Sequence, residues 1–151
     1  MLNPGKQDSS FSPPASRLCL AAVTLSALVF VVLIPALEVN DTHLFNPAWP
    51  SHARLHEAWQ LLTNAAVSLL ALILVWRNQA VPLAVLLALI VCCSFLLAWA
   101  TAGIYGGSML HSDGTELAVA GLNLAVLVVL LLTGGLLLGL WRARASKHPE
   151  A

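Results

Sequence analysis

Polar side chains recur every four residues in the middle of this chain: His52, His56, Gln60, Asn64 and Ser68. Such a spacing places side chains along one face of an α-helix, and Ser51 is a suitable N-cap for that helix. The residues that follow are mostly apolar, and polar groups are costly when they face lipid. We therefore expect this face to turn toward the interior of a helical bundle.

Other ionisable residues lie close to apolar stretches. Glu38 ends the first stretch and is followed by Asp41 and His43. Glu116 and Asn123 are seven residues apart, which predicts nearly the same face of a later helix. His111 and Asp113 come just before that helix. We expect these segments to converge on a shared pocket at one end of the bundle.

A first hypothesis for this pocket is metal binding. His52 and His56, one helical turn apart, could both reach one divalent ion. Residues that could complete the ligand shell are His43, His111, Glu38, Glu57, Asp113 and Glu116. The chain lacks a His-Glu-x-x-His sequence and the paired Glu-x-x-His pattern of di-iron bundles. The sequence identifies no other cofactor.

A second hypothesis is acid/base chemistry on a small amphipathic ligand. His56 would act as acid or base, with Glu57 or Glu116 as its orienting partner. Further candidate contacts to the ligand are Trp49, Arg54, Trp59, Gln60, Asn64, His111 and Asn123. The layout is similar to that of sterol-isomerase-like membrane proteins, which place His and Glu in the cavity of a small helical bundle. No motif matches them residue by residue.

A third hypothesis involves no chemistry. The polar residues would satisfy one another, cap helices and solvate loops in an accessory or structural membrane subunit. An interhelical hydrogen bond in lipid is worth about 0.5–2 kcal/mol, which would be enough to explain why polar residues such as His56 and Asn64 occur in a membrane span.

The elements that must position these residues are four apolar stretches. They run from Leu18 to Leu37, Ala58 to Trp76, Val81 to Ala102 and Leu117 to Leu140. Each is close to the ~20 residues that cross a ~30 Å hydrocarbon core. The chain is 59% hydrophobic and 9% charged, with a mean hydropathy of +0.85. These features predict an all-α fold, a four-helix transmembrane bundle over residues 18–141.

The distribution of charge predicts the orientation of that bundle. Six of the 7 basic residues flank one side of the spans, and Arg54 alone lies on the other. Basic flanks are retained in the cytoplasm, which places both termini there. Residues 1–17 are then a disordered cytoplasmic tail and residues 142–151 a basic cytoplasmic tail. We expect a multi-pass protein of the plasma (inner) membrane whose histidines and acids face outward or into the periplasm.

Composition also bears on partners. The formal net charge is zero, so there is no electrostatic basis for binding nucleic acid. The three cysteines form no C-x-x-C pair, which argues against a thiol oxidoreductase. Membrane lipid and a small amphipathic ligand are the expected partners. Small residues four apart, Gly121 with Ala125 and Gly135 with Gly139, indicate close helix packing, either within the bundle or in a homodimer.

A signature in the loop before the second span carries one resemblance. Asn46-Pro47-x-Trp49-Pro50-x-His52-Ala53-Arg54-x-His56 resembles the signature of a family of small four-span membrane proteins with no assigned function. It implies the fold, and Trp49, Pro50, His52, Arg54 and His56 as a unit, but no substrate. Arg54 is expected to pair with Glu38, Asp41 or Glu57, or alternatively to bind an anionic ligand.

Overall fold

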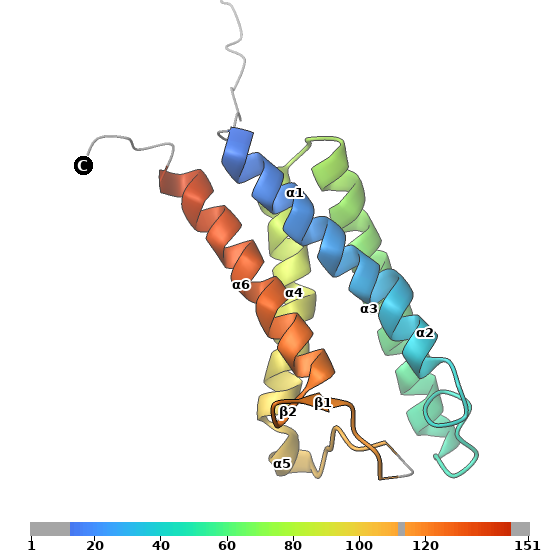
Figure 1. The fold of residues 1–151 in the computed structure, drawn as a ribbon. Helices are drawn as coiled ribbons and strands as arrows, with labels where there is room; N and C mark the ends of the chain where they lie inside the picture. The colour runs from blue at the N-terminus through green and yellow to red at the C-terminus, as the bar shows by residue number, and fades with distance from the viewer. Residues whose placement is uncertain (1–12, 112–113, 146–151) are drawn as a thin grey trace, which may run out of the picture.

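A computed structural model of the chain describes residues 13–111 and 114–145 as an up-and-down bundle of four long helices (Figure 1). The first is continuous through α1 (Pro13–Leu28), the π-helical segment η1 (Val29–Leu33) and α2 (Ile34–Glu38). The others are α3 (Ser51–Trp76), α4 (Val81–Ala100) and α6 (Leu124–Ala145). All four are long and apolar enough to cross a membrane. The helical, four-span architecture expected from the sequence is confirmed at this level.

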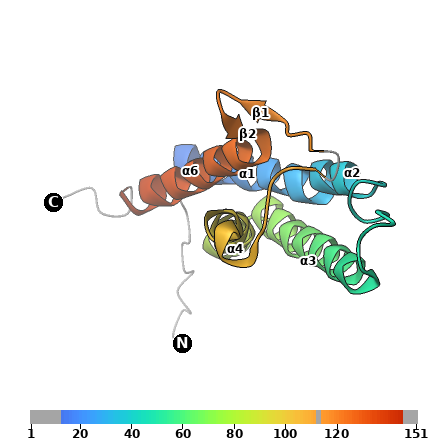
Figure 2. The same ribbon diagram turned by 90° about the horizontal axis from the view of Figure 1, so that it is seen from below.

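The four helices surround one apolar core. α1 packs against α6 and α3, and α4 packs against α3 and α6, an arrangement visible from below in Figure 2. The core contains fully buried side chains from different helices: Val23, Val85, Val126, Val129 and Leu136. Many leucines on the outside of the bundle are exposed, as lipid-facing side chains must be.

The first helix passes a proline without breaking. Pro35 lacks a backbone N–H, and its ring would clash with the carbonyl one turn earlier in a regular α-helix. The π-helical turn directly before it widens the backbone, and the Ile34 N–H bonds to the carbonyl of Val29. The helix therefore continues to Glu38 and delivers this carboxylate to the end of the bundle.

α3 begins at Ser51, where the sequence predicts a helix start, and so extends seven residues before the apolar span that begins at Ala58. The polar signature segment from Ser51 onward is therefore helical. Pro50 occupies the N-cap position, and no side chain caps the helix, so Ser51 is not the cap. Proline suits this position because its missing N–H could not have bonded within the helix.

α6 begins at Leu124, not at Leu117, because a β-hairpin precedes it. Strands β1 (Ala118–Val119) and β2 (Leu122–Asn123) pair antiparallel. The two turn residues, Ala120 and Gly121, both have positive φ, 52° and 80°, as a type I′ turn requires. Glu116 and Gly121 therefore lie outside the helix that was expected to contain them. α4 also ends slightly early, at Ala100, and short helix α5 (Ala102–Tyr105) follows.

The later glycine pair packs within the bundle. A Cβ at Gly139 would lie 2.9 Å from the sulfur of Cys19, and one at Gly135 would lie 3.8 Å from the Cβ of Ala22. Both neighbours belong to α1. Gly135 and Gly139 therefore pack against α1 within the bundle.

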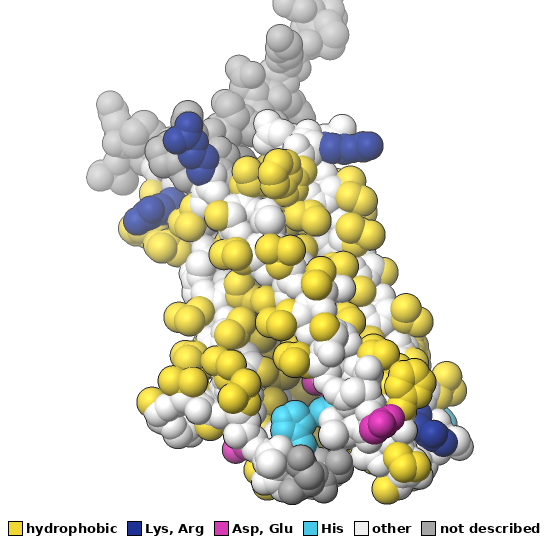
Figure 3. Space-filling model, turned by 45° about the vertical axis from the view of Figure 1, so that its right-hand side comes forward, with side chains coloured by type: hydrophobic (Ala, Val, Ile, Leu, Met, Phe, Trp, Pro, Cys, Tyr) yellow, Lys and Arg dark blue, Asp and Glu magenta, His cyan; other side chains and the backbone are white. Residues whose placement is uncertain are grey.

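Among the described residues, basic and acidic side chains lie at opposite ends of the bundle (Figure 3), apart from Arg54, which lies with the acids. Arg17, Arg77, Arg142 and Arg144 lie at what we call the basic end, where α1 begins and α6 finishes. Glu38, Asp41, Glu57 and Glu116 lie at the other, the acidic end. Residues 13–17 belong to α1 and 142–145 to α6, so these parts of the predicted tails are helical. Residues 1–12 and 146–151 lie outside the described residues.

Candidate functional site

The acidic end contains a histidine in close contact with a carboxylate. His43 Nε2 lies 3.2 Å from Glu38 Oε2, and the two side chains are only 17% and 25% exposed. Glu38 comes from the last residue of α2 and His43 from the loop that follows. Glu57 of α3 and His111 of the loop before β1 interact electrostatically with this pair. We call Glu38, His43, Glu57 and His111 the His43 cluster.

Asn40 organises the loop that presents His43. Its Nδ2 donates to the carbonyl of Leu37, which leaves its Oδ1 facing Thr42. The backbone N–H and the hydroxyl of Thr42 lie 2.8 Å and 2.7 Å from that oxygen. The Thr42 hydroxyl is also 2.8 Å from His43 Nδ1. Both ring nitrogens of His43 thus have a defined partner, which fixes the ring in place.

This network can take up one proton with little movement. When the Thr42 hydroxyl donates to Nδ1, a neutral His43 donates its Nε2–H to the Glu38 carboxylate. When Nδ1 is protonated as well, the hydroxyl turns to donate to Asn40 Oδ1, and the imidazolium keeps its bond to Glu38. The exchange requires only rotation of one hydroxyl.

The surroundings favour the neutral form of His43. Burial lowers the pKa of His43 below its ordinary value of 6.5, and the nearby His111 lowers it further, whereas Glu57 raises it. The rings of His43 and His111 meet edge to face with centroids 5.1 Å apart. Trp49 lies edge-on to His43 on another side, at 6.0 Å. Figure 3 shows histidine side chains within a hollow at this end, with an acidic side chain behind them.

Asn46 explains part of the loop signature. This side chain is buried, with 4% exposure. Its Nδ2 donates to the carbonyl of Thr42 at 3.2 Å, and its Oδ1 accepts the N–H of Ala48 at 2.9 Å. Asn46 therefore closes the loop between His43 and Trp49, and its role is to position these two rings.

The structure gathers three of the residues proposed from sequence: Glu57, His111 and Trp49. It also brings in Glu38 and His43, whose segment was expected at the shared pocket but which were assigned no role there beyond possible metal binding or, for Glu38, pairing with Arg54. A carboxylate that ends an apolar span, followed five residues later by histidine, was the signal that could have given them a central role. His56, proposed as the acid or base beside Glu57, is not part of this cluster.

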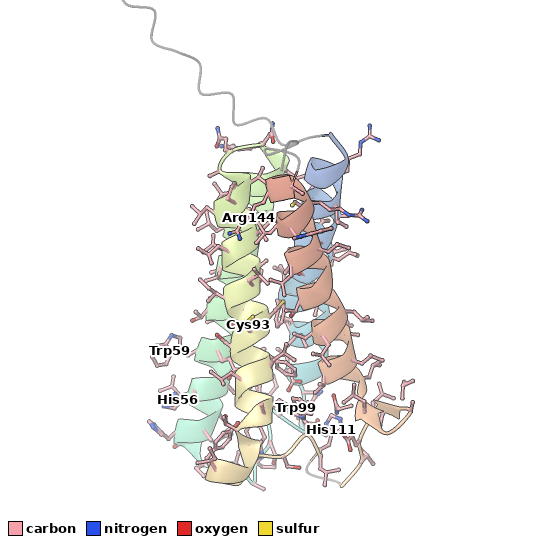
Figure 4. All side chains as sticks on the ribbon, turned by 90° about the vertical axis from the view of Figure 1, so that its left-hand side faces the viewer. His56, Trp59, Cys93, Trp99, His111 and Arg144 are labelled. Carbon is pink, nitrogen blue, oxygen red and sulfur yellow. The ribbon has the colours of Figure 1, made fainter. Side chains whose placement is uncertain are left out.

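The expectation that the polar stripe on α3 faces inward is wrong for its first half. His52, His56 and Gln60 are exposed, Asn64 is half-buried, and Ser68 is buried. Four residues turn a helix by about 400°, so the stripe drifts by about 40° at each step and about 160° overall. Figure 4 shows His56 and Trp59 pointing away from the bundle. Glu57, one position from His56, is the residue that turns toward the bundle.

The exposed part of the stripe lines a separate open hollow on α3. Its volume is about 300 Å³, and its lining residues are His56, Trp59, Gln60, Thr63 and Asn64. The ring of Trp59 lies 5.8 Å from that of His56. Candidate ligand contacts from α3 therefore form a surface distinct from the His43 cluster.

Among the described residues, Arg54 has none of the carboxylate partners that the sequence suggested for it. Arg54 is half-buried and forms no ion pair with its expected partners, which are all among the described residues: Glu38, Asp41 and Glu57.

Asn123 caps α6, because its Oδ1 accepts the N–H of Ala125 at 2.9 Å, while its Nδ2 donates to exposed Glu116 at 3.1 Å. Glu116 and Asn123 are thus paired through the hairpin and not along a helix. Asp113 lies outside the described residues.

The extended metal shell expected from sequence is not assembled. Within residues 13–111 and 114–145, no three His, Cys, Asp or Glu side chains are arranged to hold one ion. His52 and His56 do meet, with their Nε2 atoms 3.1 Å apart.

Comparisons of the chain with protein-family models, with curated proteins and with solved structures found no match.

Proposed function

We propose that this is a multi-pass protein of the plasma (inner) membrane that binds a small amphipathic cation at the His43 cluster and exchanges a proton with it. Its basic end lies in the cytoplasm, following the positive-inside rule, and its acidic end faces outward or into the periplasm. The observation that carries the proposal is the partly buried contact of 3.2 Å between Glu38 and His43, together with the Thr42 hydroxyl on the other ring nitrogen of His43.

The charge of the cluster favours a cation. Burial and His111 lower the pKa of His43, so its neutral form prevails near neutral pH. Two carboxylates, Glu38 and Glu57, then interact electrostatically in a partly buried site. A positive group on the ligand would relieve this repulsion where water screens it poorly. The described acidic end has one basic residue, Arg54, and it forms no ion pair with either carboxylate.

The apolar part of the ligand has a surface to contact. Trp49 presents its ring beside His43, and the lipid-facing surface of the bundle begins within a few residues of Glu38. A molecule with a charged head and an apolar body can therefore place its head in the cluster while its body remains in the interfacial region.

The direct test is binding of tetraphenylphosphonium, a lipophilic cation, to the purified protein in phosphatidylcholine nanodiscs. We expect Glu57→Gln to weaken this binding by about tenfold or more, because it removes one of the two carboxylates of the cluster. Glu116→Gln makes the same chemical change on the exposed hairpin and should leave the affinity unchanged. A wild-type protein that binds no more than empty nanodiscs would favour the accessory, chemistry-free alternative. Equal losses in the two variants would contradict the assigned site.

The proposed binding depends on pH with a definite sign. His43 has a pKa below 6.5, so it gains its proton only as the pH falls beneath that value. Its positive charge then competes with the cation. Affinity for tetraphenylphosphonium should therefore be constant above about pH 7 and fall progressively below pH 6.5. Titrations from pH 8 to pH 5 would measure this, and His43→Gln should make the decrease smaller, because protonation of the cluster's carboxylates still contributes to it at the acidic end of the range. An affinity that rises as the pH falls would contradict the proposal.

A further inference from the structure

We propose that His52 and His56 form a surface site for one divalent transition-metal ion, ligated through the two Nε2 atoms and filled most tightly by Cu²⁺. The site lies on the exposed face of α3 and shares no residue with the His43 cluster. It is therefore independent of the proposed function.

The geometry of the pair is that of a chelate. The two Nε2 atoms are 3.1 Å apart, and the rings are nearly perpendicular, at 81°. With metal–nitrogen distances of about 2.0–2.1 Å, this separation corresponds to an angle at the metal of about 100°. That angle lies between the 90° of square-planar and the 109° of tetrahedral coordination. An ion can enter after the proton between the two nitrogens moves through solvent to the Nδ1 atom of its ring and small ring rotations point both Nε2 lone pairs at the metal.

Helix α3 holds the pair in this position. Both residues are in the first two turns of a 26-residue helix, one turn apart on the same face. The helix is about 39 Å long, roughly 9 Å longer than the hydrocarbon core of a bilayer. With Trp76 at the opposite interface, His52 and His56 lie at the polar surface of the membrane. Both are exposed, so an aqueous ion can reach them.

The chemistry of the ligands selects the metal. Imidazole suits borderline transition metals, and affinity for such nitrogen sites rises through the series to Cu²⁺ and falls again at Zn²⁺. The described residues supply no third ligand, so water completes the coordination. We infer an exchangeable site of micromolar affinity, and not a structural metal centre, which would be closed by four protein ligands.

Trp59 provides a built-in reporter of occupancy. Its ring lies 5.8 Å from the ring of His56, tilted by 34°. Paramagnetic Cu²⁺ bound to His56 would quench the fluorescence of an indole at that distance. Trp59→Phe should therefore remove most of the quenching while leaving the binding of Cu²⁺ unchanged.

The experiment is titration of the full chain in detergent with Cu²⁺ alone, at pH 7.5 and after removal of any purification tag. Calorimetry measures affinity and stoichiometry, electron paramagnetic resonance detects nitrogen ligands, and fluorescence follows Trp59. We expect one ion per chain in the wild-type protein. His52→Ala and His56→Ala should each weaken binding by about tenfold or more, because each leaves a single imidazole. His43→Ala, which changes a histidine of the other site, should bind as the wild-type protein does.

Two results would overturn the proposal: no binding of Cu²⁺ at micromolar concentrations, or equal binding in the wild-type protein and His52→Ala. Circular dichroism of each variant excludes unfolding as the cause of a loss. Binding of tetraphenylphosphonium by His52→Ala keeps this test separate from the proposed function, since that variant should retain the cation and lose only the metal.

Discussion

A Leu136→Ala variant is expected to lose about 2–4 kcal/mol of its free energy of unfolding. Leu136 is fully buried, with 0% exposure, in the core between the four helices. Truncation would leave a cavity, and the lost contacts are not recovered by partial relaxation of the neighbours. This loss lies in the lower part of the range measured for leucine-to-alanine changes in soluble proteins. The reason is that the transfer of apolar side chains out of water does not stabilise helix packing in lipid, so only the lost packing contacts count.

Its neighbour provides a matched control. Leu137 is 53% exposed on the outer surface of α6. Lipid chains or detergent can fill the space that Leu137→Ala opens, so its stability should change by less than about 0.5 kcal/mol. Reversible unfolding with sodium dodecyl sulfate in mixed micelles, followed by circular dichroism, measures both variants. Similar losses in the two would mean that this face of α6 is not the one that packs in the core.

Gly139→Ala is expected to cost about 1–3 kcal/mol of stability through a single steric contact. A Cβ at this position would lie 2.9 Å from the sulfur of Cys19, closer than real carbon and sulfur atoms approach. Its next neighbours, the N and Cα of Cys19 at 3.5 Å and 3.6 Å, leave it enough room. The sulfur is thus the cause of the strain, and a substitution that removes it should relieve the strain.

A double-mutant cycle tests that cause. The combination Gly139→Ala/Cys19→Ala should cost less than the sum of the two single substitutions, with a coupling of about 1 kcal/mol or more. Gly134→Ala is the matched control, because a Cβ there meets nothing within 4 Å and the residue is exposed. It should be neutral or slightly stabilising, since alanine favours a helix over glycine. Additive costs in the cycle would show that α1 and α6 do not approach one another at Gly139.

The predictions for Leu136→Ala and Gly139→Ala concern the packing of α6, which supports the His43 cluster but contributes no residue to it. Leu136 and Gly139 hold α6 against its neighbours, whereas the His43 cluster is assembled from the end of α2, one turn of α3 and two loops. The variants of the cluster and of the His52/His56 pair should therefore change binding without the loss of stability expected for Leu136→Ala.

Sequence periodicity located polar residues on helices but misjudged which way they face. Glu57 and His56 are adjacent, yet the first is half-buried beside His43 and the second is exposed. A repeat of four residues does not match the 3.6 residues of a helical turn, so a polar stripe cannot remain on one face for its whole length. The direction of its first residues depends on which neighbours the helix packs against.

The hydrophobic pattern of the sequence also did not predict the geometry of the loops and of the hairpin. The apolar run from Leu117 does not reveal that Ala120 and Gly121 adopt positive φ, or that Asn123 caps the helix. The chain likewise contains Asn40, Thr42 and Asn46 without indicating that their side chains bond to backbone and imidazole. Such bonds form only when the loop closes, because each joins groups brought together by the turn itself.

The sequence by itself determined the four apolar helices and the separation of most basic from most acidic residues, because the bilayer imposes a minimum length and a polarity on any chain that crosses it. Only the tertiary structure decided that Glu38, His43, Glu57 and His111 meet while His52 and His56 pair on another surface. The reason is physical: composition fixes what can enter the membrane, but contacts between distant residues depend on helix rotation and loop closure, which only the packed bundle sets.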